Sequence, residues 1–108
     1  MPPKYRLTPA AESDLREIWR YTVESWGQQH AETYLMQLAD AFSVLADNPR
    51  LGRERPEIAN RYRSFPSGKH VIFYIIASRG INVIGVLHSS MDVKGRLSSL
   101  SQRSEDPE

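Results

Sequence analysis

The stretch that most constrains the fold is residues 69–88, KHVIFYIIASRGINVIGVLH, in which two apolar, β-branched runs flank Ser-Arg-Gly. Two such runs around a glycine-containing break are typical of a β-hairpin. Arginine is a poor residue for the two positive φ angles of a type I′ turn, so we predict a three-residue loop with Gly80 in the left-handed region. This loop pairs Ala77 with Ile81, Phe73 with Gly85 and His70 with His88.

In this register both faces of the hairpin carry apolar side chains. One face is wholly apolar and consists of Val71, Phe73, Ile75, Ala77, Ile81, Val83, Gly85 and Leu87. The other face is apolar in its middle and titratable at one end, with His70, Ile72, Tyr74, Ile76, Asn82, Ile84, Val86 and His88. A hairpin that is apolar on both faces needs a cover on both faces. The rest of the chain must therefore supply two covers or leave one face to a partner.

The N-terminal half predicts one strand and two helices. Residues 4–7 alternate and indicate a short edge strand. Thr8 and Pro9 are a good N-cap and first helical residue, and apolar residues then recur at spacings of three and four up to Gly27, a natural helix stop. The same pattern repeats in a second helix that ends before Pro49. Because the break at Gly27 is short, we expect an antiparallel αα-hairpin.

The segment between the second helix and the hairpin predicts a loop and one more strand. Residues 50–60 contain glycine, proline and alternating charges, whereas residues 61–65 alternate and can form a strand. A turn with its tip at Ser67 and Gly68 pairs Phe65 with His70, Arg63 with Ile72 and Arg61 with Tyr74. We therefore expect an α+β fold with a small antiparallel sheet, made of an edge strand and a three-strand meander, and the helical hairpin on one face.

Composition sets the size and class of the protein. The chain has 108 residues, of which 40% are hydrophobic and 25% charged, so it can form one core but not two. We expect a single domain over residues 1–97 and a disordered tail over residues 98–108. The chain has no cysteine, which excludes a disulfide framework and a thiolate metal site. No apolar run approaches the ~20 residues of a membrane span, so we expect a cytoplasmic protein without a membrane partner.

One helical hairpin can cover only one face of the sheet, and we assign it to the wholly apolar face around Phe73 and Leu87. The opposite face then remains exposed, with Arg61, Arg63 and the two histidines at its rim. Exposed apolar patches with polar rims usually mark partner sites, and we favour a partner here. The alternative is that the C-terminal segment folds back over this face through Met91, Val93 and Leu97.

Chemistry is less clearly indicated than binding. His70 and His88 can form an acid–base pair, with Arg61 and Arg63 holding phosphate, which is the equipment of a metal-free ribonuclease. We favour a simple rim position for both histidines, because no third group orients an imidazole. A metal site from His30, His70 and His88 is weaker still, since His30 belongs to the helical layer, and we expect no metal and no cofactor.

A cluster of arginines lies in and after the basic loop. Its members are Arg50, Arg53, Arg55, Arg61 and Arg63, interrupted by Glu54 and Glu57. The cluster suits an acidic partner peptide at least as well as a phosphate backbone. The net charge of the whole chain, +1, does not argue for nucleic acid. The last four residues hold three acids and no base, so the remainder of the chain is more basic than the whole.

The order of elements, an edge strand, an αα-hairpin, a basic loop and a three-strand meander, resembles the RelE/ParE superfamily of bacterial toxins from type II toxin–antitoxin pairs. The details look closest to the ParE branch. The residues that carry the resemblance are Tyr5-Arg6-Leu7-Thr8, Ala11-(x)2-Asp14-Leu15-(x)2-Ile18, Trp26-Gly27, Leu45-Ala46-(x)2-Pro49, Leu51-Gly52-Arg53 and Leu87-His88-(x)2-Met91-Asp92.

The resemblance implies a toxin that inhibits DNA gyrase by binding and is held inactive by a ParD-like antitoxin, without direct nucleic-acid binding of its own. We expect the antitoxin to cover an apolar groove on either the helical hairpin or the exposed sheet face, and to contact Arg53, Arg61, Arg63, Phe65, Ile72 and Tyr74. We expect the target to contact His88, Met91, Asp92 and Leu97. We further expect residues 90–97 to contribute to inhibition and residues 102–108 to be dispensable.

Two other functions remain open. The RelE branch cuts messenger RNA on the ribosome, and Arg61, Arg63 and His88 are the candidates for that activity here. Ser89 counts against it, because several ribonuclease relatives carry a tyrosine at this point. The third possibility is a partner-binding module without toxicity.

Overall fold

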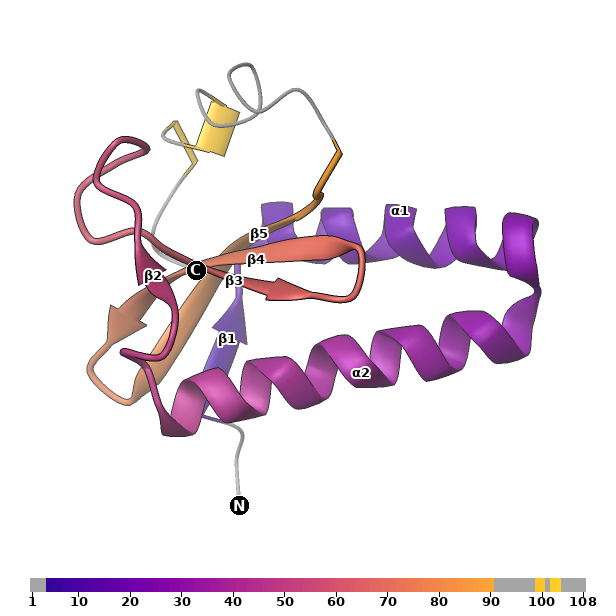
Figure 1. Cartoon of the computed structure of the whole chain (residues 1–108), viewed down its shortest axis with the longest axis horizontal. Helices are drawn as coiled ribbons and strands as arrows, with labels where there is room; N and C mark the ends of the chain where they lie inside the picture. The colour runs from indigo at the N-terminus through magenta and orange to yellow at the C-terminus, as the bar shows by residue number, and fades with distance from the viewer. Residues whose placement is uncertain (1–3, 91–98, 101, 104–108) are drawn as a thin grey trace.

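The computed structural model describes residues 4–90, 99–100 and 102–103, and Figure 1 shows a helical hairpin beside a five-stranded sheet. The elements in chain order are β1 (Tyr5–Leu7), α1 (Pro9–Trp26), α2 (Gln28–Asp47), β2 (Arg53–Glu54), β3 (Arg63–Ser67), β4 (His70–Ala77) and β5 (Gly80–His88). The strand order is β1-β5-β4-β3-β2. The predicted α+β class is confirmed, but the sheet is mixed because β1 pairs with β5 in parallel.

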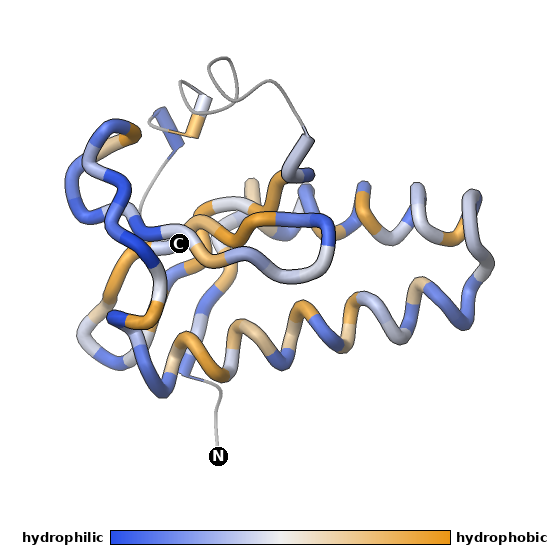
Figure 2. Tube along the Cα trace, in the orientation of Figure 1, coloured by the Kyte–Doolittle hydropathy of each residue, from blue (hydrophilic) through white to orange (hydrophobic). Residues whose placement is uncertain are grey.

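The helices begin and end where the sequence predicts. The Thr8 hydroxyl oxygen accepts a hydrogen bond from the Ala11 amide at 3.1 Å, which satisfies one of the free N–H groups of the first turn of α1. Gly27 has φ +92°, a value that few side chains tolerate, and it separates α1 from α2. Figure 2 shows hydrophobic and hydrophilic residues alternating along both helices, as expected for amphipathic helices that bury one side.

The helical hairpin covers the opposite face of the sheet from the one predicted. Its buried residues, among them Leu38, Phe42 and Leu45, pack with Ile72, Tyr74 and Val86. Ile72 and Tyr74 have no exposed surface, so the predicted exposed sheet face does not exist. The prediction was wrong because it assumed unbroken alternation of side chains through both strands of the hairpin.

A β-bulge in β5 breaks that alternation. His70 to Phe73 pair with His88 to Gly85 as predicted, but the register shifts between Phe73 and Tyr74, so that Ala77 lies opposite Gly80 and not Ile81. One extra residue moves the following side chains to the other face. Ile81 and Val83 therefore face the helices together with Val86, whereas Ile84 faces the opposite side with Phe73 and Leu87.

The second face of the sheet is covered by the chain itself. Phe73, Ile75, Ile84 and Leu87 form a second cluster with three residues from outside the sheet, Ile58, Tyr62 and Leu100. Self-cover was the alternative we favoured less, and Met91, Val93 and Leu97, the residues named for it, lie outside the described part of the chain. Leu100, which lies within the predicted disordered tail, is fully buried.

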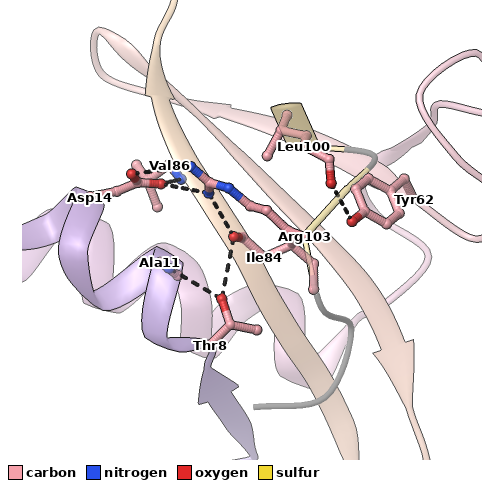
Figure 3. Close-up of polar contacts among 8 residues, drawn as sticks. All are labelled: Thr8, Ala11, Asp14, Tyr62, Ile84, Val86, Leu100 and Arg103. Atoms are coloured by element: carbon pink, nitrogen blue, oxygen red, sulfur yellow. Dashed lines mark hydrogen bonds and ion pairs between the residues drawn. The ribbon is translucent and has the colours of Figure 1, made fainter. Parts of the chain in front are cut away.

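An ion pair beside the bulge holds the segment that contains Leu100 and Arg103 against the sheet (Figure 3). Arg103 Nη1 donates to Asp14 Oδ2 and to the Ile84 carbonyl oxygen, both at 2.9 Å. Asp14 Oδ2 also accepts from the Val86 amide at 3.0 Å. Gly85 makes room for this arrangement, because a Cβ there would collide with the guanidinium of Arg103. The carboxylate of α1 thus pairs with a residue that the sequence placed in a solvated tail.

The β3–β4 hairpin is displaced by two residues from its predicted register. Ser67 pairs with His70, Phe65 with Ile72 and Arg63 with Tyr74, so the tip is Gly68 and Lys69. An even shift keeps each side chain on its predicted face relative to β4. The polarity of β3 therefore predicted correctly which face each of its side chains lies on. The predicted position of the turn was wrong.

Candidate functional site

An arginine-lined cleft of about 310 Å³ lies where the basic loop meets β3. It is lined by Arg50, Glu54, Pro56, Asn60, Arg61, Tyr62, Arg63 and Ile76. We call it the arginine cleft. It brings together Arg61 and Arg63 of the predicted antitoxin contacts, whereas Arg53, the third arginine of that prediction, does not line it.

Arg63 has mainly a structural role in this cleft. Its Nη1 donates to the carbonyl oxygens of Gly52 at 2.7 Å and Arg50 at 3.3 Å, and its side chain is only 12% exposed. Arg61 is exposed, and its Nη2 donates to the Ile76 carbonyl oxygen at 3.3 Å. The two predicted arginines therefore differ: Arg63 ties the loop to the sheet, and Arg61 faces the cleft.

A histidine pair lies at the far end of the sheet. The rings of His70 and His88 are 5.2 Å apart between centroids, and His70 Nδ1 lies 2.5 Å from the Tyr34 hydroxyl. Burial, followed by the nearby His88, lowers the pKa of His70 to about 4. His70 is therefore neutral at pH 7. Tyr34 is the orienting group that the sequence did not reveal, because it comes from α2.

The predicted nuclease residues are not gathered in one place. His88 pairs with His70, which pairs with Ser67, four residues along β3 from Arg63. Strand geometry puts these backbones about 16 Å apart. His30 lies near the start of α2, where its ring is 6.1 Å from that of Trp26 between centroids. Among residues 4–90, 99–100 and 102–103, no group of three or more His, Asp or Glu could hold a metal ion.

A third candidate surface lies on the helical hairpin. Leu15, Arg16, Trp19, Arg20, Val23, Glu24 and Leu35 line a groove of about 630 Å³, which we call the helical groove. Trp19 remains 36% exposed, an unusual state for a tryptophan on an amphipathic helix. Its lining combines four apolar residues with two arginines and one acid.

The remaining predicted contact residues fall into two groups. Ile72, Tyr74 and Phe65 pack in or against the helix-facing core, so the sheet face offers no groove made of them. The Tyr74 hydroxyl donates to the Pro49 carbonyl oxygen at 2.7 Å and accepts from the Gly52 amide at 2.9 Å. Of the predicted target contacts, His88 is partly buried at the sheet rim, and Met91, Asp92 and Leu97 lie outside the described residues.

Comparison with known proteins identifies the family. The family model described as ParE toxin of type II toxin–antitoxin system, parDE, matches residues 5–93. The chain is 44% identical to Toxin ParE1 of Mycobacterium tuberculosis over 98 residues, which cover 90% of this chain and all of the relative. It is 36% identical to Toxin ParE1 of Caulobacter vibrioides, over 86% of this chain and 96% of the relative. The chain belongs to the ParE toxin family.

A solved structure supports the same fold. The chromosomal ParDE TA system from P. aeruginosa contains a chain that superposes with a TM-score of 0.67, covering 78% of this chain and 92% of the other, at 16% identity. At that identity the likeness concerns the fold alone. The predicted resemblance to the ParE branch is therefore confirmed by the family model and by the curated relatives.

Two details of this ParE family member were not predicted from its sequence. A groove on the helical hairpin was one of the two expected antitoxin sites, but its lining residues were not named, although the adjacent Ile18 and Trp19 cannot both face one sheet. The Asp14–Arg103 pair had no signal, since an acid and an arginine separated by 89 positions look like two solvated charges. Within the part of the chain that the structure describes, no helix is long and apolar enough to cross a membrane.

Proposed function

We propose that this chain is the toxin of a type II toxin–antitoxin system, that it inhibits DNA gyrase by binding, and that a ParD-like antitoxin neutralises it in the cytoplasm. The observation that carries the proposal is the ParE family match across residues 5–93. That match covers every described helix and strand up to β5. The geometry is compatible with inhibition by binding, because the chain offers grooves more clearly than it offers a catalytic constellation.

The separation of the nuclease candidates supports a non-catalytic toxin. General acid–base catalysis needs the reacting groups within hydrogen-bond reach of one substrate. Arg63 is held by backbone carbonyl oxygens, and His88 lies at the other end of the sheet from it. The His88 ring instead accepts a hydrogen bond from the Ser90 amide at 3.1 Å. Ribosome-dependent cleavage of messenger RNA is therefore the second candidate.

The helical groove is our proposed main antitoxin site. An amphipathic antitoxin helix would place apolar anchors between Leu15, Trp19, Val23 and Leu35, and acidic residues against Arg16 and Arg20. Apolar anchors in a desolvated groove carry most of the affinity of such interfaces, whereas rim charges tune the association rate. The sequence offered two places for an antitoxin groove, the helical hairpin and one face of the sheet. We propose the helical hairpin, because that sheet face is buried.

The test is gyrase supercoiling in a purified system that contains no ribosomes. The chain, released from its antitoxin, should block supercoiling, and adding the antitoxin back should restore it. Cleavage of messenger RNA in a translation mixture, lost in His88→Ala or Arg61→Ala, would overturn the non-catalytic proposal. Expression without growth arrest, in cells that make no antitoxin, would favour the module without toxicity.

A further inference from the structure

A cleft of about 540 Å³ lies between α1 and the open end of the β4–β5 hairpin. Its lining residues are Asp14, Glu17, Ile18, Tyr21, His70, Val86, Leu87, His88 and Ser90. We call it the histidine cleft. The proposed function has not yet given it a role, although the sequence predicted that His88 contacts the target.

The histidine cleft and the helical groove lie on different sides of α1. Consecutive residues of a helix are turned by about 100°, so Glu17 and Tyr21, four positions apart, lie on one side. Trp19, two positions from each, points roughly the opposite way. Among the described residues, none lines both the cleft and the groove. A ligand in the histidine cleft therefore leaves Trp19, an anchor of the proposed antitoxin site, uncovered.

The hydrogen bonds of the two imidazole rings determine what they offer to a ligand. The Tyr34 hydroxyl oxygen accepts from the Lys69 amide at 3.0 Å, so its proton is directed at His70 Nδ1, 2.5 Å away. His88 Nδ1 accepts from the Ser90 amide at 3.1 Å. A neutral imidazole whose Nδ1 accepts a hydrogen bond carries its proton on Nε2. Both rings therefore present an Nε2–H group.

Both Nε2–H groups are available to a ligand. Neither Nε2 atom has a hydrogen-bond partner among the described residues, and no polar side-chain atom of those residues is buried without a partner. The two Nε2 atoms therefore reach solvent, and the rings that carry them line the cleft. They need an acceptor, such as a peptide carbonyl oxygen. They disfavour a metal ion, because the lone pair of each ring is already engaged at Nδ1.

The uncompensated charge of the cleft is negative. Its described lining contains two acids and no lysine or arginine. Asp14 is paired with Arg103, and His70 is neutral at pH 7 because burial, followed by the nearby His88, lowers its pKa to about 4. Glu17 is exposed and has no ion-pair partner among the described residues. A cationic group is therefore favoured beside Glu17.

Tyr21 adds an exposed aromatic ring one helical turn from Glu17. It is 65% exposed. Arginine suits this combination better than lysine, because its planar guanidinium can stack on an aromatic ring while it donates two hydrogen bonds to one carboxylate. Ile18, Val86 and Leu87 supply apolar lining, against which the methylene groups of an arginine side chain can pack.

We propose that the histidine cleft is the surface with which this toxin binds its target, and that it takes an arginine-bearing segment of the target protein. The guanidinium pairs with Glu17 and stacks on Tyr21, while backbone carbonyl oxygens of the segment accept from His70 and His88. This proposal rests on the proposed function in one respect, namely that the chain acts by binding a protein. Because the two sites lie on different sides of α1, single substitutions should separate target binding from antitoxin binding.

Glu17→Gln and Tyr21→Ala test the cleft in the full chain, because both residues are exposed and lie outside the core. Supercoiling by purified gyrase gives the toxin concentration for half-inhibition, and calorimetry gives the affinity for the antitoxin. Half-inhibition should need about fivefold more of the Glu17→Gln chain and about tenfold more of the Tyr21→Ala chain. Antitoxin affinity should stay within about twofold of that of the unmodified chain.

Asp40→Asn and Met36→Ala are the matched controls. They remove an exposed acid and an exposed large side chain of α2 that line neither the cleft nor the groove. Both should leave the half-inhibiting concentration and the antitoxin affinity unchanged. Trp19→Ala should give the reverse of the cleft variants, with weaker antitoxin binding and unchanged half-inhibition. Urea unfolding of each variant checks that it is folded.

Two short peptides test the chemistry of the ligand without gyrase. They are acetyl-Gly-Arg-Gly amide and the same peptide with citrulline, which is neutral and has nearly the same shape as arginine. In an NMR titration the arginine peptide should move the ring resonances of Tyr21 and His88, with a dissociation constant of the order of 10 mM. The citrulline peptide should bind about fivefold more weakly, and Glu17→Gln should remove that difference.

Unchanged half-inhibition by both Glu17→Gln and Tyr21→Ala would overturn the proposal while leaving gyrase inhibition intact. Equal binding of the two peptides, or an equal loss of antitoxin binding in the cleft variants, would also overturn it. If the unmodified chain does not block supercoiling, growth arrest in cells without antitoxin replaces that measurement. Variants that lose growth arrest but keep antitoxin binding would then support the cleft with a target other than gyrase, and unchanged growth arrest would overturn it.

Discussion

Asp14→Ala should be among the most damaging single substitutions of a polar residue in this protein. The carboxylate accepts from the Val86 amide and from Arg103, and the two side chains are 14% and 18% exposed. Removing it leaves a half-buried guanidinium without its partner and an amide of the bulged strand without its acceptor. A charge-assisted hydrogen bond contributes about 1.5–3 kcal/mol, and the shielded ion pair adds to it. We expect a loss of about 3 kcal/mol in the free energy of unfolding.

Arg103→Ala should cost less, about 1.5 kcal/mol, because the Val86 amide keeps its carboxylate partner while the bond to the Ile84 carbonyl oxygen is lost. The double variant should be more stable than the sum of the single effects implies. The expected coupling is about 1 kcal/mol, as is usual for groups in one hydrogen-bond network. The order of the two single effects is the part of this prediction that the geometry fixes most firmly.

Urea unfolding measures these differences, with the midpoint falling and the m-value unchanged. A loss of 3 kcal/mol corresponds to a melting temperature lower by roughly 10 °C or more in a domain of this size. Asp40→Ala is the control, because Asp40 is an exposed acid on α2 and should cost less than about 0.5 kcal/mol. An Asp14→Ala effect as small as that of Asp40→Ala, or strictly additive single effects, would refute the role of this ion pair.

Three further outcomes follow from the structure. Tyr74→Phe should cost about 1–2 kcal/mol in urea unfolding, since its hydroxyl joins two loop backbone groups; an unchanged midpoint would contradict this. Trp19→Ala should weaken antitoxin binding at least tenfold by calorimetry, whereas Met36→Ala, which removes an exposed residue outside the groove, should not; equal effects would count against the helical groove. The free energy of unfolding should fall by roughly 1–2 kcal/mol, after allowance for solvent screening, as the pH drops from about 6.5 towards 4. The reason is that His70 takes up a proton in the unfolded chain in this range but stays neutral in the folded chain, where its pKa is about 4. A His70→Phe variant that keeps the full pH dependence would show that another group causes it.

Local patterns in the sequence predicted the elements well. Thr8, Gly27 and Asn48 act locally, through a cap, a positive φ and the following proline, so the limits of both helices follow from neighbours in the chain. The central hairpin and its open-end pairing, His70 with His88, likewise follow from alternation and turn chemistry. The parallel pairing of β1 does not, because it depends on where the helical hairpin returns the chain.

The faces of the sheet were assigned wrongly because the bulge at Ile84 has no local signal. The Ile84 carbonyl oxygen accepts hydrogen bonds from the Thr8 hydroxyl, at 3.3 Å, and from Arg103. Both donors lie far from β5 in the sequence, and they lie far from each other. Only the folded chain brings these donors together. The bulge puts Ile81 and Val83 on the same face as Ile72 and Tyr74, and this face, expected at an antitoxin site, is the core that packs on the helices.

The stoichiometry of gyrase inhibition tests most directly whether this ParE family member acts by binding. Gyrase at a fixed concentration well above the dissociation constant is titrated with the chain, and supercoiling is measured after each addition. An inhibitor that binds should reach full effect near a fixed ratio of toxin to gyrase, with messenger RNA intact in a parallel translation mixture. Unaffected supercoiling at every ratio, together with cleavage of messenger RNA by amounts of the chain far below those of the ribosomes, would contradict it.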